Sequence, residues 1–132
     1  MAITGIGVDL VDIARFEQQL EKTPGLTERL FSPAELSGDS ALKPATLAGK
    51  FAAKEAFIKA LGSGVGLNWH DVRVVKDSDG KPFFELSGDT AAASVKAGVS
   101  RWHLSIAHDG GMAIAYAIAE NDATGQQGGA HA

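Results

Sequence analysis

Phe51-Ala-Ala-Lys-Glu-Ala-Phe-Ile-Lys-Ala-Leu61 is the stretch that organises this sequence, because it places an acid where a helix should bury only hydrocarbon. At about 100° per residue on a helical wheel, Glu55 lies within an apolar stripe that includes Phe51 and Ile58. Lys59 lies beside it, one turn further on. An exposed i,i+4 ion pair is the common explanation for this spacing. A carboxylate among apolar side chains is costly unless it is paired or metal-bound, so we interpret Glu55 as functional.

The sequence around this stretch predicts an α+β domain in which one long helix covers antiparallel hairpins. Pro44 begins that helix and Gly62 ends it. The capping box Ser32-Pro-Ala-Glu35 begins a short helix. The other elements predicted by residue periodicity and turn signals are a strand over 3–8 that ends at Asp9, a helix over 11–22, strands over 72–76 and 82–86 joined at Asp79-Gly80, a helix over 89–97, and strands over 102–108 and 112–118.

The composition of the chain is that of one ordinary globular domain. It has 132 residues, of which 45% are hydrophobic and 21% charged, with a formal net charge of −4. The acidic balance argues against a general nucleic-acid binder, which needs a basic surface. Cysteine is absent, which excludes disulfides, thiolate catalysis and zinc–thiolate sites.

The two ends of the sequence carry expectations of their own. Met1-Ala-Ile-Thr-Gly5 has no basic segment before an apolar run, and no stretch approaches membrane-spanning length. We therefore expect a cytoplasmic protein with no membrane partner. Residues 1–119 are expected to form one catalytic domain. Residues 120–132 contain almost no core-forming side chains, and we expect them to be a disordered tail.

Asp9 is the second acid of interest. Strand alternation places Gly7 and Asp9 on the same face, and the glycine is expected to leave open space beside the carboxylate. On its own, Asp9 could simply end the strand or cap the next helix. Together with Glu55 it suggests a magnesium site, because two carboxylates, waters and substrate phosphates commonly hold that ion.

Several basic or glycine-rich features near Glu55 could bind phosphate. Lys59 projects from nearly the same helical face, and the turn from Gly62 to Gly66 could offer backbone N–H groups to an anion. Most such glycine clusters are plain connectors. Lys50 and Lys54 fall on the flank of the helix, where lysines are ordinarily solvated, although a polyphosphate could use one of them.

His108 and Arg15 are the remaining candidates. His108 ends an alternating strand, a place where a hydrogen-bonded surface histidine is more common than a catalytic one. Arg15 and Arg29, near two early helices of an acidic protein, could form a docking patch for an acidic partner. Isolated solvated arginines are the ordinary explanation for both.

Three blocks of this sequence follow one another in order, and the first and third, taken together at their spacing, are highly specific. The three blocks are Gly5–Phe16, Phe31–Glu35 and Lys50–Ala56, and shorter matches follow at Lys59–Gly62, Gly80–Pro82 and His103–His108. With this order and spacing, residues 3 to 118 resemble the holo-[acyl-carrier-protein] synthase family, the small single-domain group of 4′-phosphopantetheinyl transferases. The resemblance implies transfer of the phosphopantetheine arm of coenzyme A to a serine of an acyl carrier protein, in support of fatty acid biosynthesis. It also implies a compact α+β fold and a homotrimer whose active sites lie at subunit interfaces.

The resemblance also implies roles for individual residues, of which Asp9, Glu55 and Lys59 would be catalytic. The implied roles are magnesium ligation by Asp9 and Glu55, diphosphate contact by Lys59 with Gly62, Ser63 and Gly64 alongside, contact with the 3′-phosphate of coenzyme A by Lys50 and His108, and carrier-protein docking by Arg15. Either Glu55 or a metal-activated water would take the serine proton.

This sequence departs from the family at two positions near His108. Family members commonly have Ser-x-Ser-His, whereas here Ala107 lacks the hydroxyl and Asp109 adds an acid. Two other activities would use the same acids and lysines. One is a non-enzymatic module that senses a nucleotide through magnesium, and the other is a magnesium-dependent hydrolase of nucleotide diphosphates.

Overall fold

The computed structural model describes residues 1–62 and 67–122. Ser63 and Gly64, expected beside the diphosphate, therefore lie outside the described residues, as does the expected tail from residue 123 onward. Its elements in chain order are β1 (Ala2–Asp12), α1 (Ile13–Lys22), α2 (Leu26–Leu30), the 3-10 helix η1 (Pro33–Leu36), α3 (Pro44–Leu61), the 3-10 helix η2 (Trp69–Asp71), β2 (Val72–Lys76), β3 (Pro82–Leu86), α4 (Gly88–Lys96), β4 (Arg101–Asp109) and β5 (Met112–Asn121).

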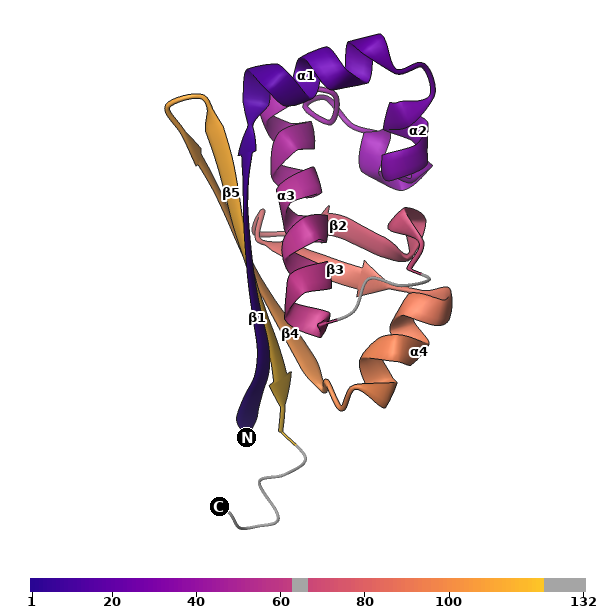
Figure 1. The fold of residues 1–132 in the computed structure, drawn as a ribbon, viewed down its shortest axis with the longest axis vertical. Helices are drawn as coiled ribbons and strands as arrows, with labels where there is room; N and C mark the ends of the chain where they lie inside the picture. The colour runs from indigo at the N-terminus through magenta and orange to yellow at the C-terminus, as the bar shows by residue number, and fades with distance from the viewer. Residues whose placement is uncertain (63–66, 123–132) are drawn as a thin grey trace.

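The helix α3 lies between two antiparallel sheets, which confirms the predicted α+β class. One sheet has three strands in the order β1-β5-β4, and the other is the β2–β3 hairpin. Figure 1 shows α3 running along the inner face of the three-stranded sheet, with the hairpin on its other side. Since both sides of α3 are covered, residues from nearly all around the helix contribute to the core.

The ends of α3 are set by local sequence, as predicted. Pro44 occupies the first turn, where its missing N–H would have no helical partner. Gly62 has a φ of 89°, in the left-handed region, and its N–H donates to the carbonyl oxygen of Ile58. The predicted capping box also forms: the side chains of Ser32 and Glu35 each accept from the backbone N–H of the other residue.

β1 and α3 approach each other closely because β1 carries glycine on its inner face. A Cβ at Gly7 would overlap the carbonyl oxygen of Ala56, and one at Gly5 would overlap that of Ala60. On β5 the residues facing α3 are likewise small and buried, and they are Ala113, Ala115, Ala117 and Ala119. The expectation of open space beside Gly7 is therefore wrong, since the backbone of α3 fills it.

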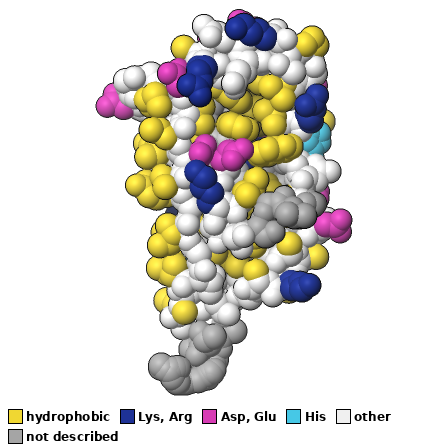
Figure 2. All heavy atoms as spheres, viewed as in Figure 1, with side chains coloured by type: hydrophobic (Ala, Val, Ile, Leu, Met, Phe, Trp, Pro, Cys, Tyr) yellow, Lys and Arg dark blue, Asp and Glu magenta, His cyan; other side chains and the backbone are white. Residues whose placement is uncertain are grey.

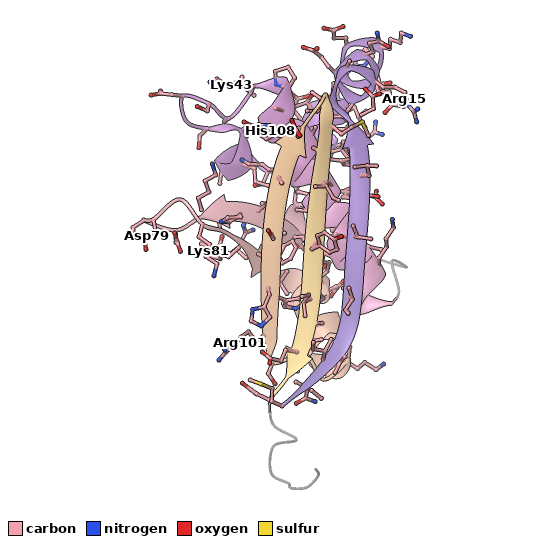
Figure 3. The ribbon with its side chains drawn as sticks, turned by 90° about the vertical axis from the view of Figure 1, so that its left-hand side faces the viewer. Arg15, Lys43, Asp79, Lys81, Arg101 and His108 are labelled. Atoms are coloured by element: carbon pink, nitrogen blue, oxygen red, sulfur yellow. The ribbon has the colours of Figure 1, made fainter. Side chains whose placement is uncertain are left out.

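The outer face of the three-stranded sheet is apolar and exposed. Ile6, Val8 and Leu10 alternate on β1 and are 61%, 40% and 59% exposed. Val8 lies opposite Tyr116 of β5, which is 48% exposed. Figure 3 views the molecule from this side and shows no helix covering the sheet. The sheet therefore presents a continuous apolar face that no described helix covers.

The element boundaries differ most from those predicted at the ends of β1 and β5. β1 continues to Asp12, so α1 begins at Ile13 rather than at residue 11, and the Asp12 carboxylate caps the helix by accepting from the backbone N–H of Arg15. β5 continues to Asn121, and Glu120 lies opposite Arg101 of β4. The expected boundary at 119/120 therefore falls inside a strand, because pairing with β4 and β1 orders these residues.

In the described part of the chain, every helix is too short or too polar to cross a bilayer.

Candidate functional site

Asp9, Glu55 and Lys59 come together where β1 meets α3. The Lys59 ammonium lies 3.1 Å from Asp9 Oδ1 and donates to the backbone carbonyl of Val8 at 2.9 Å. Glu55 is within electrostatic reach of both side chains. Figure 2 shows acidic and basic side chains meeting in the middle of a largely hydrophobic face. The convergence of Asp9 with the helix, inferred from sequence, is thus present in the fold.

Glu55 is half-buried, and its pKa is raised. Burial is the main cause, because it removes water from the charged form, and the negative charge of Asp9 adds to the shift. The Lys59 ammonium opposes both effects. The helical wheel predicted that Glu55 lies at the centre of a buried apolar stripe. In the structure, Glu55 is only half-buried. The charged residue of α3 that is fully buried is Lys54.

The raised pKa of Glu55 predicts a pH-dependent stability difference between the wild type and Glu55→Gln. An acid whose pKa is higher in the folded state than the unfolded value of 4.5 destabilises the fold once it ionises. In metal-free buffer we therefore expect Glu55→Gln to melt at a higher temperature than the wild type at neutral pH. The difference should shrink as pH falls through the raised pKa towards 4.5. Thermal melts of both proteins across this range provide the measurement, and a pH-independent difference would contradict the prediction.

The donor set at this place suits a hard divalent cation. It consists of two neighbouring carboxylates whose mutual repulsion a cation would relieve. The described residues contain no group of three or more His, Cys, Asp or Glu side chains placed to hold a metal. A magnesium ion between Asp9 and Glu55 would therefore complete its coordination with water or substrate oxygens, as this ion commonly does.

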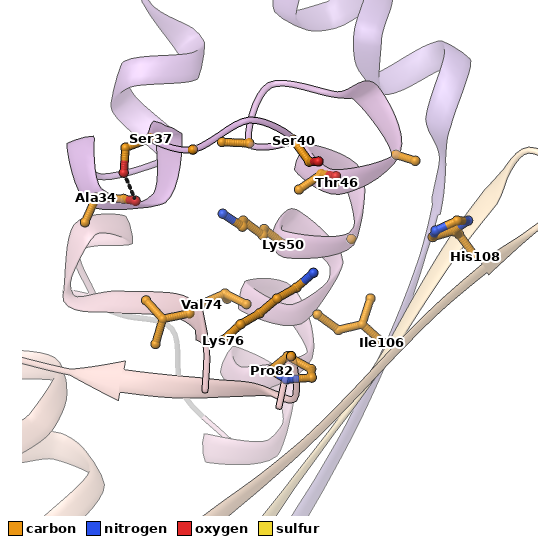
Figure 4. Close-up of a pocket in the computed structure, with 16 residues that line it drawn as sticks. Ala34, Ser37, Ser40, Thr46, Lys50, Val74, Lys76, Pro82, Ile106 and His108 are labelled. Carbon is orange, nitrogen blue, oxygen red and sulfur yellow. Dashed lines mark hydrogen bonds between the residues drawn. The ribbon is translucent and has the colours of Figure 1, made fainter. Parts of the chain in front are cut away.

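A second candidate region is a cavity of about 500 Å³ on the other side of α3. Basic side chains from three elements line it: Lys50 of α3, Lys76 of β2 and His108 of β4 (Figure 4). Hydroxyl groups of Ser37, Ser40 and Thr46, all lining residues, add hydrogen-bonding capacity. Basic groups and hydroxyls around a cavity favour an anion such as a phosphate.

Lys50 is held in this cavity wall by the backbone. Its ammonium donates to the carbonyl oxygen of Glu35 at 2.7 Å. Burial lowers the pKa of Lys50, the negative charge of Glu35 opposes that shift, and the positive charge of Lys76 adds to it. A bound phosphate would supply the missing negative charge to both lysines.

Lys76 was not singled out from the sequence, although a signal was present. Strand alternation puts it on the same face as Val72 and Val74, whose side chains are buried. A lysine that follows two core positions on one face, at the end of a strand, lies at the rim of that core. The hairpin then turns at Asp79-Gly80, as predicted, and Gly80 and Pro82 complete this side of the cavity.

The carboxylates and the basic cavity lie on opposite flanks of α3. Lys50 and Glu55 are about 140° apart around the helix at 100° per residue. Asp9 is on β1 and His108 on β4, the two edge strands of the sheet. Figure 3 shows His108 at the β4 edge and Arg15 towards the β1 edge. The buried alanines of α3 and β5 show that α3 is packed tightly against the sheet between the two regions.

Lys54 and Glu35 form a buried ion pair that sequence reasoning missed. The ammonium lies 2.8 Å from Glu35 Oε1, and neither side chain is exposed. Lys54 was expected on a solvated flank, and Glu35 only in the capping box. Residues 31–35 and 69–74 cover this flank of α3, which no helical wheel of α3 alone could indicate.

Comparison with known proteins places these features in a family. Residues 5–117 match the family described as the 4′-phosphopantetheinyl transferase superfamily. The chain belongs to this superfamily. A curated protein of Clavibacter michiganensis subsp. michiganensis, named holo-[acyl-carrier-protein] synthase, is 51% identical over 121 residues, which are 92% of this chain and 98% of that protein.

Solved structures of other phosphopantetheinyl transferases share the fold. The holo-[acyl-carrier-protein] synthase of Neisseria meningitidis is 30% identical, with a TM-score of 0.81 over 91% of this chain and 100% of that one. That of Helicobacter pylori, solved in complex with coenzyme A, is 34% identical, with a TM-score of 0.77 over 87% of this chain and 99% of that one.

In this transferase, the two departures near His108 lie away from the cavity. Ile106 and His108 line it, so they share the inner face of β4. Ala107 and Asp109 alternate onto the opposite face, and both are exposed. The hydroxyl that Ala107 lacks would therefore point away from the cavity formed by the same chain.

Proposed function

We propose that this protein transfers the 4′-phosphopantetheine group of coenzyme A to a serine of an acyl carrier protein and releases adenosine 3′,5′-bisphosphate. The observation that carries the proposal is that one chain with the fold of this superfamily has both a basic cavity and a pair of carboxylates. A single substrate with separate phosphate groups needs both kinds of site. Near-full-length relatives bear the name holo-[acyl-carrier-protein] synthase, and a solved relative contains coenzyme A.

The basic cavity is the proposed site for the nucleotide end of coenzyme A. The 3′-phosphate would be held by Lys50 and His108, as the resemblance implies, and also by Lys76, which faces the same space. These groups recognise negative charge in a partly buried place, where charge-assisted hydrogen bonds are strong. The cavity therefore fixes one end of the substrate while the reacting diphosphate lies elsewhere.

The carboxylate pair is the proposed site of chemistry, with Asp9 and Glu55 holding magnesium. When bound, the ion offsets negative charge on the diphosphate. Lys59, which pairs with Asp9 in this structure, would contact the diphosphate oxygens, with Gly62 nearby at the end of α3. The serine hydroxyl oxygen attacks the β-phosphorus, and the bond from that phosphorus to the bridging oxygen breaks. The serine proton passes to Glu55 or to a water beside it.

A composite site follows from the separation of the two regions. Because α3 and the sheet are packed together between the two regions, we infer that one coenzyme A does not reach both regions of a single chain. The carboxylates of one copy and the basic cavity of another would have to face each other. The exposed apolar outer face, with Ile6, Val8, Leu10 and Tyr116, is the kind of surface that copies bury. We infer a homotrimer that covers this face and forms its active sites between subunits.

Disrupting the apolar face should therefore abolish both assembly and activity. Tyr116→Asp places a charge at the middle of this face, and we expect it to yield monomers that bind the metal but do not transfer. Analytical ultracentrifugation and the transfer rate provide the two measurements. Val95→Asp changes an apolar residue on α4 that is even more exposed, and it is the matched control, for which we expect no change in either measurement. An active monomeric Tyr116→Asp protein would contradict the composite site.

Arg15 is the proposed contact for the acidic carrier protein. It is exposed on α1, where Lys22 lies on the same helix face seven residues later. Glu17 and Glu21 lie on the other flank, which would orient an acidic partner towards the Arg15 side. Figure 3 places Arg15 towards β1, the strand that carries Asp9, so the docked serine would arrive on the carboxylate side. The cytoplasmic location expected from sequence stays a prediction.

The proposed activity is tested by incubating the protein with coenzyme A, magnesium and an apo-acyl carrier protein. We expect the carrier protein to gain the mass of one phosphopantetheine group on its serine. Cleavage of coenzyme A without this gain would indicate a hydrolase, and binding without cleavage would indicate a sensor. Mass spectrometry of carrier and nucleotide products distinguishes the three outcomes.

A further inference from the structure

The buried Glu35–Lys54 pair connects α3 to elements that are distant in sequence. The Lys54 ammonium donates to three acceptors: the carbonyl of Leu30 at the end of α2 (2.8 Å), Glu35 Oε1 of η1 (2.8 Å), and the carbonyl of Trp69 in η2 (2.9 Å). Its positive charge also lies 5.3 Å from the ring centre of Phe31. All three protons of the ammonium are therefore used.

The Glu35 carboxylate is equally well satisfied. Oε1 accepts from the backbone N–H of Ser32 at 2.9 Å in addition to Lys54, and Oε2 accepts from the backbone N–H of Val74 in β2 at 2.9 Å. Burial lowers the pKa of Lys54, and the hydrogen bond to Glu35 opposes that shift. A fully hydrogen-bonded buried pair of this kind constrains geometry, whatever its net contribution to stability.

The pair lies directly behind the wall of the basic cavity. Its neighbours Ala34 and Ser37 line the cavity on one side, and Val74 lines it on another. The backbone carbonyl of Glu35 accepts from Lys50, the cavity lysine on α3. Two walls of the cavity and one of its basic groups are therefore fixed relative to one another through a single carboxyl-bearing residue.

We propose that Glu35 and Lys54 are positioning residues for the cavity, holding η1, β2 and the Lys50 ammonium at the spacing that a phosphorylated nucleotide requires. The inference rests on the proposed function, because it takes the occupant to be the nucleotide end of coenzyme A. Neither residue contacts the substrate. Removing the pair should weaken substrate binding while leaving the reacting groups on the other flank of α3 unchanged.

The test separates positioning from stability with four variants. Lys54→Met leaves a buried carboxylate unpaired, and Glu35→Gln is a milder change that keeps an acceptor for one of the two backbone N–H groups. The double variant Glu35→Gln/Lys54→Met removes both charges and keeps a side-chain acceptor for the backbone, and removing both charges of a buried pair commonly recovers the stability that a single variant loses. Phe57→Leu is the matched control, since this buried α3 residue packs on Phe84 and Trp102, which do not line the cavity.

Thermal melts, steady-state kinetics and calorimetric binding of adenosine 3′,5′-bisphosphate are measured for each protein. We expect the double variant to recover melting temperature relative to Lys54→Met. Its KM for coenzyme A should remain raised by about tenfold, the factor expected from one lost charge-assisted hydrogen bond, with kcat within about twofold of the wild type. The nucleotide affinity should fall in parallel, and Phe57→Leu should lose melting temperature without a change in KM.

Three results would overturn the positioning role. One is recovery of KM together with melting temperature in the double variant, and another is an unchanged KM in Glu35→Gln. A raised KM in Phe57→Leu would also overturn it, because destabilisation alone would then explain the effect. If the wild type binds neither coenzyme A nor adenosine 3′,5′-bisphosphate, the proposed function fails instead, and the two failures are thereby distinguishable.

Discussion

Glu55→Gln and Asp9→Asn should each lower the rate of phosphopantetheine transfer by about a thousandfold or more, with the fold intact. Each change keeps the size of the side chain but removes one of the two negative charges at the site where β1 meets α3. The remaining carboxylate would hold magnesium poorly, and Glu55→Gln would also remove a candidate base for the serine proton. The fold should survive because ionised Glu55 is half-buried among apolar groups beside Asp9, and its raised pKa shows that its charge is not a stabilising one.

Mass spectrometry of carrier-protein modification, at saturating and at limiting magnesium, gives the rates. Glu85→Gln makes the same chemical change on β3, where Glu85 pairs with Arg73 on the surface, and we expect it to leave transfer unchanged. Binding of manganese as a magnesium substitute, followed by its electron paramagnetic resonance signal, reads the metal site without turnover. A near-wild-type rate of either site variant at limiting magnesium would show that the metal assignment is wrong.

Gly7→Ala should be among the most damaging single-methyl changes in the fold. The added Cβ would overlap the carbonyl oxygen of Ala56, a helix backbone atom that cannot rotate away. Overpacking of a core typically costs 1–3 kcal/mol, and a backbone clash belongs at the upper end, so we expect a loss of about 3 kcal/mol or more in the free energy of unfolding. Because domains of this size are stable by only about 5–15 kcal/mol, much of the protein would be unfolded under mild denaturing conditions.

Urea denaturation followed by circular dichroism measures the free energy of unfolding. Gly49→Ala is the matched control, since its added Cβ would lie 3.0 Å from the Ile106 side chain, which can shift. Alanine also favours the helix by about 1 kcal/mol relative to glycine, so we expect little net change. If the free energy of unfolding of Gly7→Ala were within about 0.5 kcal/mol of the wild-type value, β1 and α3 would have to separate at little cost.

The predicted elements agree with the structure where local chemistry determines them. Pro44 and Gly62 mark the ends of α3, the Ser32–Glu35 capping box forms, and the hairpin turns at Asp79-Gly80. Where tertiary pairing decides, prediction was less accurate: β1 and β5 extend further than their apolar runs, because each residue added to a paired strand gains hydrogen bonds regardless of its side chain.

The candidate site also contains residues that local patterns predicted and residues that only tertiary packing explains. Alternation and helical spacing identified Asp9, Glu55 and Lys59, and the fold brings Lys59 into contact with Asp9. Only part of the basic cavity was predicted from the sequence. Lys76 was missed because it comes from a hairpin whose position over α3 no local pattern encodes. Lys54 was misjudged for a related reason. A helical wheel describes one helix, whereas burial depends on which other elements cover each flank.

The sequence alone determined the family of this protein, the elements around α3 and the acids at its centre, since these depend on residue type and short-range spacing. Only the tertiary structure decided that Glu55 is half-buried while Lys54 is fully buried, that α3 fills the space beside Gly7, and that the carboxylates and the basic cavity lie on opposite flanks of one helix. Those outcomes depend on how close β1 and α3 can approach and on what packs against each side. Such packing is a property of the assembled chain, which short-range spacing does not encode.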